Sequence, residues 1–410
     1  MDPIRNPYAP GAGQRPPELA GREAERDAFD VVLERVAHAR PERSIVLTGL
    51  RGVGKTVLLN ALRSAAVRRG WGTGKLEARP DQSIRRPVAA ALHVAVRELA
   101  TPHRGEADSV LGVVKSFAQH VPSGDRAPKL RDRWQAGIAV PAVTGRADSG
   151  DIEIDLLELF SDVAGLAADS GHGIALFLDE MQDLGPQDVS ALCAACHELS
   201  QQGLPLVVVG AGLPHLPAVL SASKSYSERL FRYARIDRLD RAAADLALRA
   251  PAREEGADFT DDALEAMYEA TGGYPYFVQA YGKAVWDAAP RSPISAADVA
   301  VAAPEAETEL AVGFFGSRYE RATPAEREYL RAMADLAPEA GAGRTEIATA
   351  AVATALGRAP QSLSPARDGL LKKGLVYSGQ RGKIAFTVPH FGRYLRAHPD
   401  DPGESRTDVR

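Results

Sequence analysis

The sequence predicts an α/β fold: a parallel β-sheet within the first 240 residues, then a small helical region and a compact C-terminal module. Two short apolar runs without polar alternation, SIVLTG at 44–49 and IALFLD at 174–179, are typical of strands buried on both faces of a parallel sheet. Amphipathic stretches separate these runs, and alternating strands and helices imply crossover connections. From Arg241 the strand pattern gives way to helices.

Each element of the first region follows from its local pattern. The first expected element is a helix, because two glutamates that favour a helix start are followed by apolar residues at helical spacing: Phe29, Val32, Leu33 and Val36. Residues 101–150 have no clear pattern, and we expect an insertion or a mobile loop there. The other expected elements are strand 44–49, helix 56–69, strand 72–78, helix 88–100, helix 156–170, strand 174–179, helix 188–202 and strand 204–210.

Composition sets the broad class of protein. A chain of 410 residues that is 45% hydrophobic and 25% charged is typical of a soluble globular protein with about two to three domains. Its net charge of −5 does not favour an overall attraction to nucleic acid, so such a partner needs a local basic patch. Few cysteines and an N-terminus without an apolar leader predict a cytoplasmic protein. The longest uncharged run, 199–223, is interrupted by prolines, so we expect no membrane segment.

A phosphate-binding loop follows the first predicted strand. Residues Gly49 to Thr56 fit the pattern G-x-x-x-x-G-K-T between a buried strand and a long helix. In such a loop, backbone N–H groups and the helix N-terminus bind phosphate oxygens, Lys55 bridges the β and γ phosphates, and the Thr56 hydroxyl ligates magnesium. The predicted ligands are therefore ATP or ADP with Mg²⁺. The residues expected to contact the nucleotide here are Gly49, Leu50, Arg51, Gly52, Val53, Gly54, Lys55, Thr56 and Val57.

Two acidic residues close the apolar run IALFLDE further along the chain. Asp179 would hold the magnesium ion through water, and Glu180 would orient or deprotonate the attacking water. The sequence therefore predicts an ATP-hydrolysing site in which Glu180 and Lys55 are catalytic and Thr56 and Asp179 hold the metal.

With both motifs in place, residues 21–398 resemble the AAA+ and STAND superclass of P-loop ATPases, most closely the archaeal and bacterial relatives of the origin-recognition initiators. The resemblance implies that GRE at 21–23, with Arg22, borders the nucleotide. It also implies an arginine finger that reaches the γ-phosphate of a neighbouring subunit, with Arg229 as the first candidate and Arg232 as the second. The alternative for either arginine is a solvated helix residue.

The segment GGYPYF at 272–277 resembles the lid element that this superclass sets against adenine, here through Pro275. The alternative is a plain helix end followed by a proline that starts the next helix. Two features depart from the family pattern: the strand LPLVVVGAG carries no polar sensor residue, and Tyr276 stands where initiators often keep an arginine. We therefore expect slow hydrolysis and a switch between ATP-bound and ADP-bound states.

A third motif, Cys193-Ala-Ala-Cys196-His197, matches the C-x-x-C-H pattern of covalent haem attachment. These residues lie in an expected helix beside the apolar Leu192 and Leu199, and no second cysteine pair completes a zinc site. We expect no haem here, only small buried cysteines on a helix face.

The C-terminal module has a pattern of three helices and a two-stranded hairpin, over TPAEREYLRAMADL, RTEIATAAVATALG, SLSPARDGLLKKGLVYS and QRGKIAFTV. This pattern resembles a winged helix-turn-helix. Residues 322–398 contain eleven Lys or Arg against six Asp or Glu, a net charge of +5, whereas the rest of the chain carries −10. The charge favours double-stranded DNA as the partner of this module.

In a helix-turn-helix the third helix enters the major groove and the wing follows the backbone. We therefore expect Arg367 near base edges. The expected phosphate contacts are Lys372, Lys373, Arg381 and Lys383. The alternative is a module that binds a protein partner or packs on its own core.

The expected domain plan is a flexible N-terminal arm over 1–18, a P-loop ATPase core over 19–240 with a possible insertion at 101–150, a helical lid and connecting helix over 241–321, a winged helix-turn-helix over 322–398, and a disordered tail over 399–410. The expected function is a switch that binds and hydrolyses ATP, couples nucleotide state to DNA binding, and can form a homo-oligomer. Its rivals are a STAND-like signalling or defence ATPase whose oligomerisation is driven by ATP, and a structural ATP binder without turnover.

Overall fold

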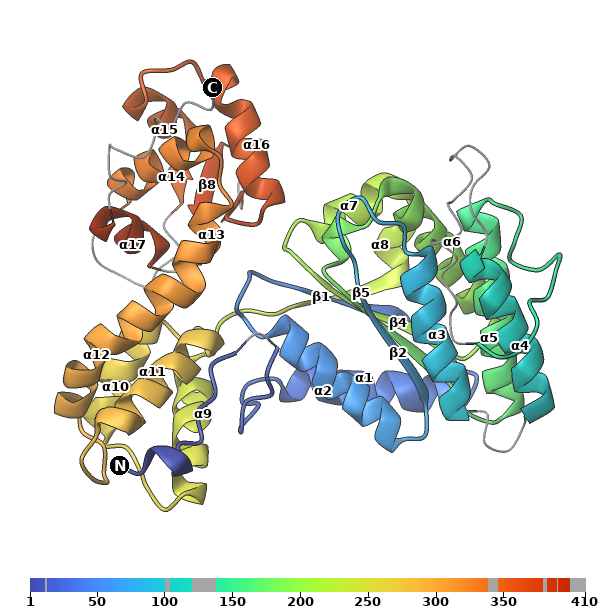
Figure 1. Ribbon diagram of the computed structural model, residues 1–410, viewed down its shortest axis with the longest axis horizontal. Coiled ribbons are helices and arrows are strands. Elements are labelled where there is room, and N and C mark those ends of the chain that lie inside the picture. The colour runs from blue at the N-terminus through green and yellow to red at the C-terminus, as the bar shows by residue number, and fades with distance from the viewer. Residues whose placement is uncertain are drawn as a thin grey trace. The chain divides into compact units, whose positions relative to one another are not determined.

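The computed structural model describes residues 1–11, 13–99, 104–119, 138–337, 346–378, 382–388 and 390–398 (Figure 1). The chain divides into two compact units. The α/β unit contains Arg22–Gly49 and Lys55–Ile236, and the C-terminal unit contains Met1–Gly21, Leu50–Gly54 and Asp237–Arg410. The middle of the phosphate-binding loop therefore belongs to the C-terminal unit.

The α/β unit is built on a five-stranded parallel sheet, which confirms the predicted fold class. Every residue of the strands β1, β3 and β4 is buried, as expected for strands covered on both faces. Figure 1 shows helices on both sides of this sheet. The strands, in spatial order, are β2 (Gly72–Glu77), β3 (Ile174–Asp179), β4 (Leu206–Gly212), β1 (Ser44–Thr48) and β5 (Phe231–Arg235).

The helices of this unit connect the strands in the alternating order that the sequence predicts. They are α1 (Glu23–Ala37), α2 (Lys55–Arg68), α3 (Arg85–Leu99), α4 (Arg104–Gln119), α5 (Ile152–Asp169), the short η3 (Met181–Asp183), α6 (Pro186–Gln202), α7 (Leu216–Ser223) and α8 (Ser227–Leu230). No helix in the described parts of the chain is long and apolar enough to cross a bilayer.

Part of the segment without a clear sequence pattern forms the helix α4. Its residues Val114 and Phe117 are fully buried in the core of the α/β unit. Residues 104–119 therefore belong to the folded core, whereas residues 120–137 lie outside the described part of the chain.

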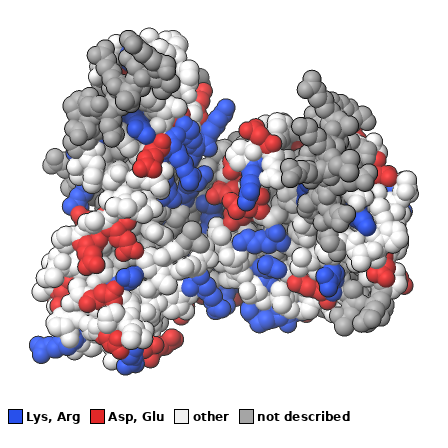
Figure 2. Space-filling view, viewed as in Figure 1, with Lys and Arg blue, Asp and Glu red and all other residues white. Residues whose placement is uncertain are grey.

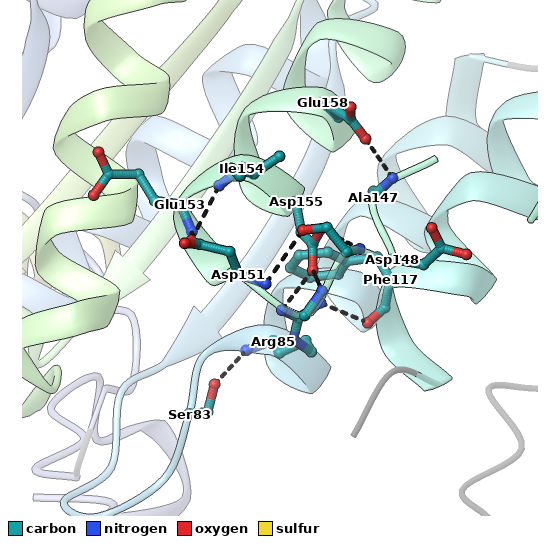
Figure 3. Close-up of polar contacts among 12 residues, drawn as sticks. Ser83, Arg85, Phe117, Ala147, Asp148, Asp151, Glu153, Ile154, Asp155 and Glu158 are labelled. Atoms are coloured by element: carbon teal, nitrogen blue, oxygen red, sulfur yellow. Dashed lines mark hydrogen bonds and ion pairs between the residues drawn. The ribbon is translucent and has the colours of Figure 1, made fainter. Parts of the chain in front are cut away.

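A buried ion pair ties α4 to its neighbours (Figure 3). Arg85 on α3 lies 2.8 Å from Asp155 on α5, with side chains 7% and 0% exposed. The Arg85 guanidinium also lies 4.6 Å from the ring centroid of Phe117 and donates to its carbonyl at 3.3 Å. Asp155 accepts hydrogen bonds from Ser149 and from the backbone N–H of Gly150. One network thus joins three helices and the loop before α5.

The C-terminal unit begins with a bundle of helices. They are η1 (Pro3–Arg5), α9 (Arg241–Glu254), α10 (Asp261–Thr271), α11 (Pro275–Ala288), α12 (Ala296–Leu310), the π-helical segment η4 (Ala311–Gly316) and α13 (Ser317–Glu320). The first residues of the chain pack on this bundle, which differs from the expectation of a flexible arm over 1–18. Tyr8 is 3% exposed and donates its hydroxyl to the carbonyl of Leu248, and the indole N–H of Trp286 donates to the carbonyl of Asp2.

The end of the chain forms a helical module with a three-stranded antiparallel sheet of order β6-β8-β7. The sequence indicated the three helices and two of the strands but not the short strand β6 or the last helix. The elements are α14 (Pro324–Leu336), β6 (Ile347–Ala348), α15 (Thr349–Ala355), η5 (Pro360–Leu363), α16 (Ser364–Lys372), β7 (Val376–Tyr377), β8 (Lys383–Phe386) and α17 (Phe391–Ala397). The expected tail, 399–410, lies outside the described residues.

Candidate functional site

The two acidic residues and the start of the phosphate-binding loop lie at the same edge of the sheet. In the register of the parallel strands, Thr48 at the end of β1 pairs with Gly212 of β4, and Leu178 of β3 pairs with Gly210. One strand, β4, therefore lies between β1, which leads into the loop, and β3, which ends at Asp179. In open α/β sheets ligands bind at this carboxyl edge.

The phosphate-binding loop has the backbone that its sequence requires. Gly54 has a φ of +90°, which favours glycine, and a Cβ placed there would meet no atom within 4 Å. Lys55 begins α2, is 8% exposed and donates to the carbonyl of Gly49 at 2.9 Å. The side chains of Leu50 and Val53 are buried, so these two residues offer the nucleotide only their backbone. The open space at Gly54 and the adjacent ammonium fit a phosphate group.

Oxygen donors that suit magnesium come from both motifs. Asp179 is the last residue of β3 and is 6% exposed, and its Oδ1 accepts the N–H of Glu180 at 3.0 Å. Thr56 follows Lys55 in the first turn of α2. A hydroxyl and a carboxylate are ligands that Mg²⁺ prefers, usually with several waters retained. These two residues would hold the ion.

Glu180 is held in place by a residue that the sequence analysis missed. It has a left-handed backbone, with φ of 51°, and its Oε2 accepts the side-chain N–H of Gln182 at 2.7 Å. The Oε1 of Gln182 in turn accepts the N–H of Leu213 at 3.0 Å. Gln182 therefore connects the predicted catalytic carboxylate to the end of β4.

The strand β4 carries no polar sensor residue, but the side chain of Gln182 contacts the end of this strand. A Cβ added at Gly212 would lie 2.7 Å from Cδ2 of Leu216 and 2.9 Å from Oε1 of Gln182, so a larger residue would have to shift these two side chains. The polar group at the end of β4 thus comes from the loop after β3. A glutamine three residues after the Asp, beside a Gly-rich strand end, is the signal that could have identified it.

The two finger candidates lie near the edge strand β5. Arg229 is on α8, and Arg232 is on β5; both are exposed. Among the described residues neither side chain forms an ion pair. Arg22 precedes α1 and is 8% exposed. The structure thus leaves Arg229 and Arg232 free to contact another molecule.

The GGYPYF segment has the geometry of a helix end followed by a helix start. Gly272 ends α10 with φ of 58°, and Pro275 begins α11. The ring of Tyr276 stacks on Phe314 of η4, with ring centroids 4.8 Å apart. Tyr274 is 3% exposed, and its hydroxyl donates to the carbonyl of Thr387 at 2.9 Å. This segment therefore connects the helical bundle to the C-terminal module.

A cavity of about 900 Å³ lies in the C-terminal unit, between the helical bundle and the C-terminal module. Tyr274, Phe277, Phe315, His390 and Arg393 are among its lining residues. Burial lowers the pKa of His390. Aromatic rings meet across the same boundary: Phe315 of η4 stacks on Phe391 and Tyr394 of α17, with ring centroids 5.7 and 5.2 Å apart.

Two of the predicted phosphate contacts of the C-terminal module form ion pairs within it. Lys373 pairs with Glu326, which is 5% exposed. Burial acts to raise the pKa of the Glu326 carboxyl, but hydrogen bonds from Lys373 and Thr323 outweigh burial, so this pKa is lowered. Lys383 lies 3.4 Å from Glu346. Both lysines therefore have structural partners that compete with phosphate.

The other predicted contacts differ in their environment. Arg367 on α16 lies 3.1 Å from the neighbouring Asp368. Lys372, at the end of α16, is exposed and forms no ion pair among the described residues. Arg381 lies outside them. Figure 2 shows Lys and Arg side chains gathered over the side of the module on which α16 lies.

The cysteine motif lies on α6, as predicted, with both thiols buried and free. Burial raises the pKa of Cys193 to about 11 and also raises that of Cys196. His197 stacks on Tyr226, with ring centroids 4.5 Å apart. These thiols are therefore protonated at neutral pH and poorly suited to reaction or metal binding.

Two family models match the chain. Residues 18–209 match the AAA ATPase domain, and residues 312–395 match a domain of unknown function (DUF8462). The first match covers the phosphate-binding loop, Asp179 and Glu180. The second begins within η4, so the segment before α14 belongs with the C-terminal module. No curated protein matches the chain in sequence.

Several solved structures resemble the chain over nearly its whole length. A Walker-type ATPase of Pyrococcus abyssi is 16% identical, with a TM-score of 0.57 over 93% of this chain and 97% of that one. The RuvB Holliday junction branch migration motor of Thermotoga maritima is 17% identical, with a TM-score of 0.44 over 91% and 96%. Cdc6p of Pyrobaculum aerophilum is 16% identical, with a TM-score of 0.43 over 97% and 96%. Only the first score exceeds 0.5, and at this identity it shows a shared fold alone.

Proposed function

We propose that the protein is a P-loop ATPase of the AAA+ type and that it acts as a slow switch whose nucleotide state controls DNA binding by residues 322–398. Lys55 and the loop backbone would hold the phosphates, and Thr56 and Asp179 would hold Mg²⁺. The metal supplies a Lewis acid at the phosphates. Glu180 orients the attacking water, and Gln182 fixes the position of its carboxylate. Arg22 and Pro275 would border the base.

The contact that carries the proposal is made by Tyr274. A Cβ at Gly52 of the phosphate-binding loop would lie 3.8 Å from Cδ1 of Tyr274, while the hydroxyl of the same tyrosine bonds to Thr387. Thr387 donates its own hydroxyl to the carbonyls of Gly374 and Leu375, directly after α16. One side chain therefore connects the loop to the predicted DNA-reading helix.

The cavity next to Tyr274 supports a joint that can change its geometry. Besides the Tyr274 bond, an ion pair between Arg393 and Glu307 at 3.1 Å crosses from the C-terminal module to α12. The cavity leaves open volume beside these polar contacts and beside the stack of Phe315 on Phe391. A change at the loop can then alter the position of α16 without unfolding either part.

The exposed side of α16 and the module's net charge of +5 support double-stranded DNA as the partner. Because Lys373 and Lys383 have carboxylate partners, we assign the main phosphate contact on α16 to Lys372. Arg367 remains the proposed base-reading residue. The exposed Arg229 supports a homo-oligomer in which it completes the site of a neighbouring copy.

The proposal predicts salt-dependent DNA binding through Lys372. Each phosphate contact contributes about −0.9 to the slope of log affinity against log salt concentration. Lys372→Ala should therefore reduce that slope by about one and weaken all sequences alike. Fluorescence anisotropy of labelled duplexes at several salt concentrations measures this.

The control is Lys283→Ala, which removes a partly exposed lysine of α11 that pairs with Asp287 of the same helix. It should leave the slope unchanged. If the wild-type protein shows no DNA binding at low ionic strength with either ATP or ADP, the DNA-binding proposal is wrong.

One observation favours the rival function, a STAND-like signalling ATPase whose C-terminal module binds protein. Two of the module's predicted phosphate contacts, Lys373 and Lys383, form ion pairs with Glu326 and Glu346. A module whose basic residues are used internally presents less charge to DNA. The absence of DNA binding in the experiment above would favour this rival.

A further inference from the structure

Residues 2–9, called the strap below, connect two helices of the bundle. The strap lies beside α9 and α11 (Figure 1). Just after the end of α9, Arg5 forms an ion pair with Glu255 at 2.9 Å. On α11, the carboxylate of Asp287 accepts a hydrogen bond from the side chain of Asn6 at 2.7 Å. The strap therefore cross-links the two helices.

The strap has a single buried anchor, Tyr8. Within residues 2–9, all of which the structure describes, only Tyr8 is buried, whereas Ile4 is 93% exposed. The Tyr8 ring packs edge-on against Phe259 and Trp286, with ring centroids 6.5 and 6.3 Å apart. Because one side chain supplies the buried contacts, the strap can detach without unfolding the helices beneath it.

Both helices are shaped to receive this anchor. On α9, the carbonyl of Leu248 accepts the hydroxyl of Tyr8. On α11, a Cβ added at Gly282 would lie 2.8 Å from Cδ1 of Tyr8, so the ring lies directly against the helix backbone. Glycine is unfavourable inside a helix compared with alanine. Its presence at this position leaves the space that the ring of Tyr8 occupies.

The chain between the strap and the α/β unit also follows α9. A Cβ at Gly21 would lie 2.8 Å from Cβ of Ala243, in the first turn of α9. The next residue, Arg22, begins the α/β unit and is the residue that we expect beside the nucleotide. The strap also holds α11, which begins directly after Tyr274. It therefore contacts the helix next to the proposed coupling residue and is covalently connected to Arg22.

We propose that the strap is a regulatory element whose docking on α9 and α11 depends on the bound nucleotide. The docked strap holds α11 in place next to Tyr274, and the released strap leaves α11 free to shift. This inference rests on the proposed nucleotide switch and adds a means of regulating it. Because coupling is reciprocal, a strap that responds to the nucleotide must change nucleotide affinity by the same factor.

The test is hydrogen–deuterium exchange, followed by mass spectrometry, on the full-length Glu180→Gln protein saturated with ATP or with ADP. In the docked strap, the N–H groups of Tyr8 and Ala9 are hydrogen bonded to the side chains of Asn6 and Gln279. Their exchange reports how often the strap detaches. Exchange of the strap should differ between the two nucleotides by about 5- to 150-fold.

Two variants release the strap from opposite sides. Tyr8→Ala removes the anchor, and Gly282→Val leaves the strap unchanged but fills its place on α11. Each should speed strap exchange by at least roughly tenfold. Each should also change the ratio of ATP to ADP affinity by the factor that separates the two nucleotides in the exchange experiment. The control is Ile4→Ala on the exposed side of the strap, which should change neither quantity.

Equal strap exchange with ATP and with ADP would overturn the inference. So would a Tyr8→Ala protein whose strap exchanges faster but whose ratio of ATP to ADP affinity is unchanged, because the strap would then only support the bundle. Failure of the proposed DNA switch gives a different result. In that case DNA affinity is equal in the two states while strap exchange still depends on the nucleotide.

Discussion

Replacing Lys55 with alanine is expected to weaken ATP binding by at least roughly 100-fold. Lys55 is 8% exposed and bonds to the carbonyl of Gly49, so its ammonium is fixed at the start of α2. A hydrogen bond to a charged group contributes about 1.5–3 kcal/mol, and each 1.4 kcal/mol is tenfold in affinity. Loss of the charge also removes the main electrostatic partner of the β and γ phosphates. Isothermal titration calorimetry with ATP and Mg²⁺ measures the effect.

Glu180→Gln is the matched variant, because it changes the other predicted catalytic residue without removing a phosphate contact. It should bind ATP as tightly as the wild type and hydrolyse it about 10²- to 10⁴-fold more slowly. A steady-state phosphate-release assay gives the rate. Equal ATP affinity in Lys55→Ala and wild type would show that the nucleotide binds elsewhere.

The second large effect concerns stability. Arg85→Met should lower the free energy of unfolding of the α/β unit by about 3–5 kcal/mol, because it leaves the carboxylate of Asp155 buried without its cation. The Arg85 guanidinium also covers Phe117, so packing is lost with the charge. The control is Arg69→Met, which removes an exposed partner of Glu34 and should cost less than about 1 kcal/mol. Urea unfolding followed by circular dichroism compares them, and equal midpoints for the two variants would contradict the assignment.

The same network gives a pH dependence. Burial acts to raise the pKa of Asp155, but hydrogen bonds from Ser149 and Arg85 outweigh it, so the pKa is lowered. A pKa that is lower in the folded state than in the unfolded state stabilises the fold at pH values above the unfolded-state pKa of Asp, about 3.9. This contribution is lost as the pH falls through the folded pKa. The stability difference between wild type and Arg85→Met should therefore shrink in acid.

The sequence predicted those parts of the site whose residues lie close together in the chain. The strand β1, the loop to Thr56 and the pair after β3 each have a signature within about ten residues, so the amino-acid pattern alone was enough to indicate them. The helix α4 was missed because Gly105 and Gly112 interrupt its helical pattern, and its apolar face packs on the distant helices α3 and α5. Its place in the core is a tertiary effect.

The remaining site residues could not be identified from local sequence because their roles come from contacts across the chain. Gln182 matters through a glycine some 30 residues later on β4. Tyr274 matters because the loop residue Gly52 packs in the unit that contains it. The first residues of the chain looked unstructured because their partners, among them Leu248, lie in distant helices.

DNA affinity in the two nucleotide states tests the central claim most directly. The measurement is anisotropy of a labelled duplex with Glu180→Gln protein, saturated with ATP or with ADP. The account predicts that the DNA affinities in the two states differ by about 5- to 150-fold, the usual range of coupling between two sites. When Tyr274→Phe removes the bond to Thr387, the ratio of the two DNA affinities should be smaller. Equal DNA affinity in the two states, or no DNA binding in either, would contradict it.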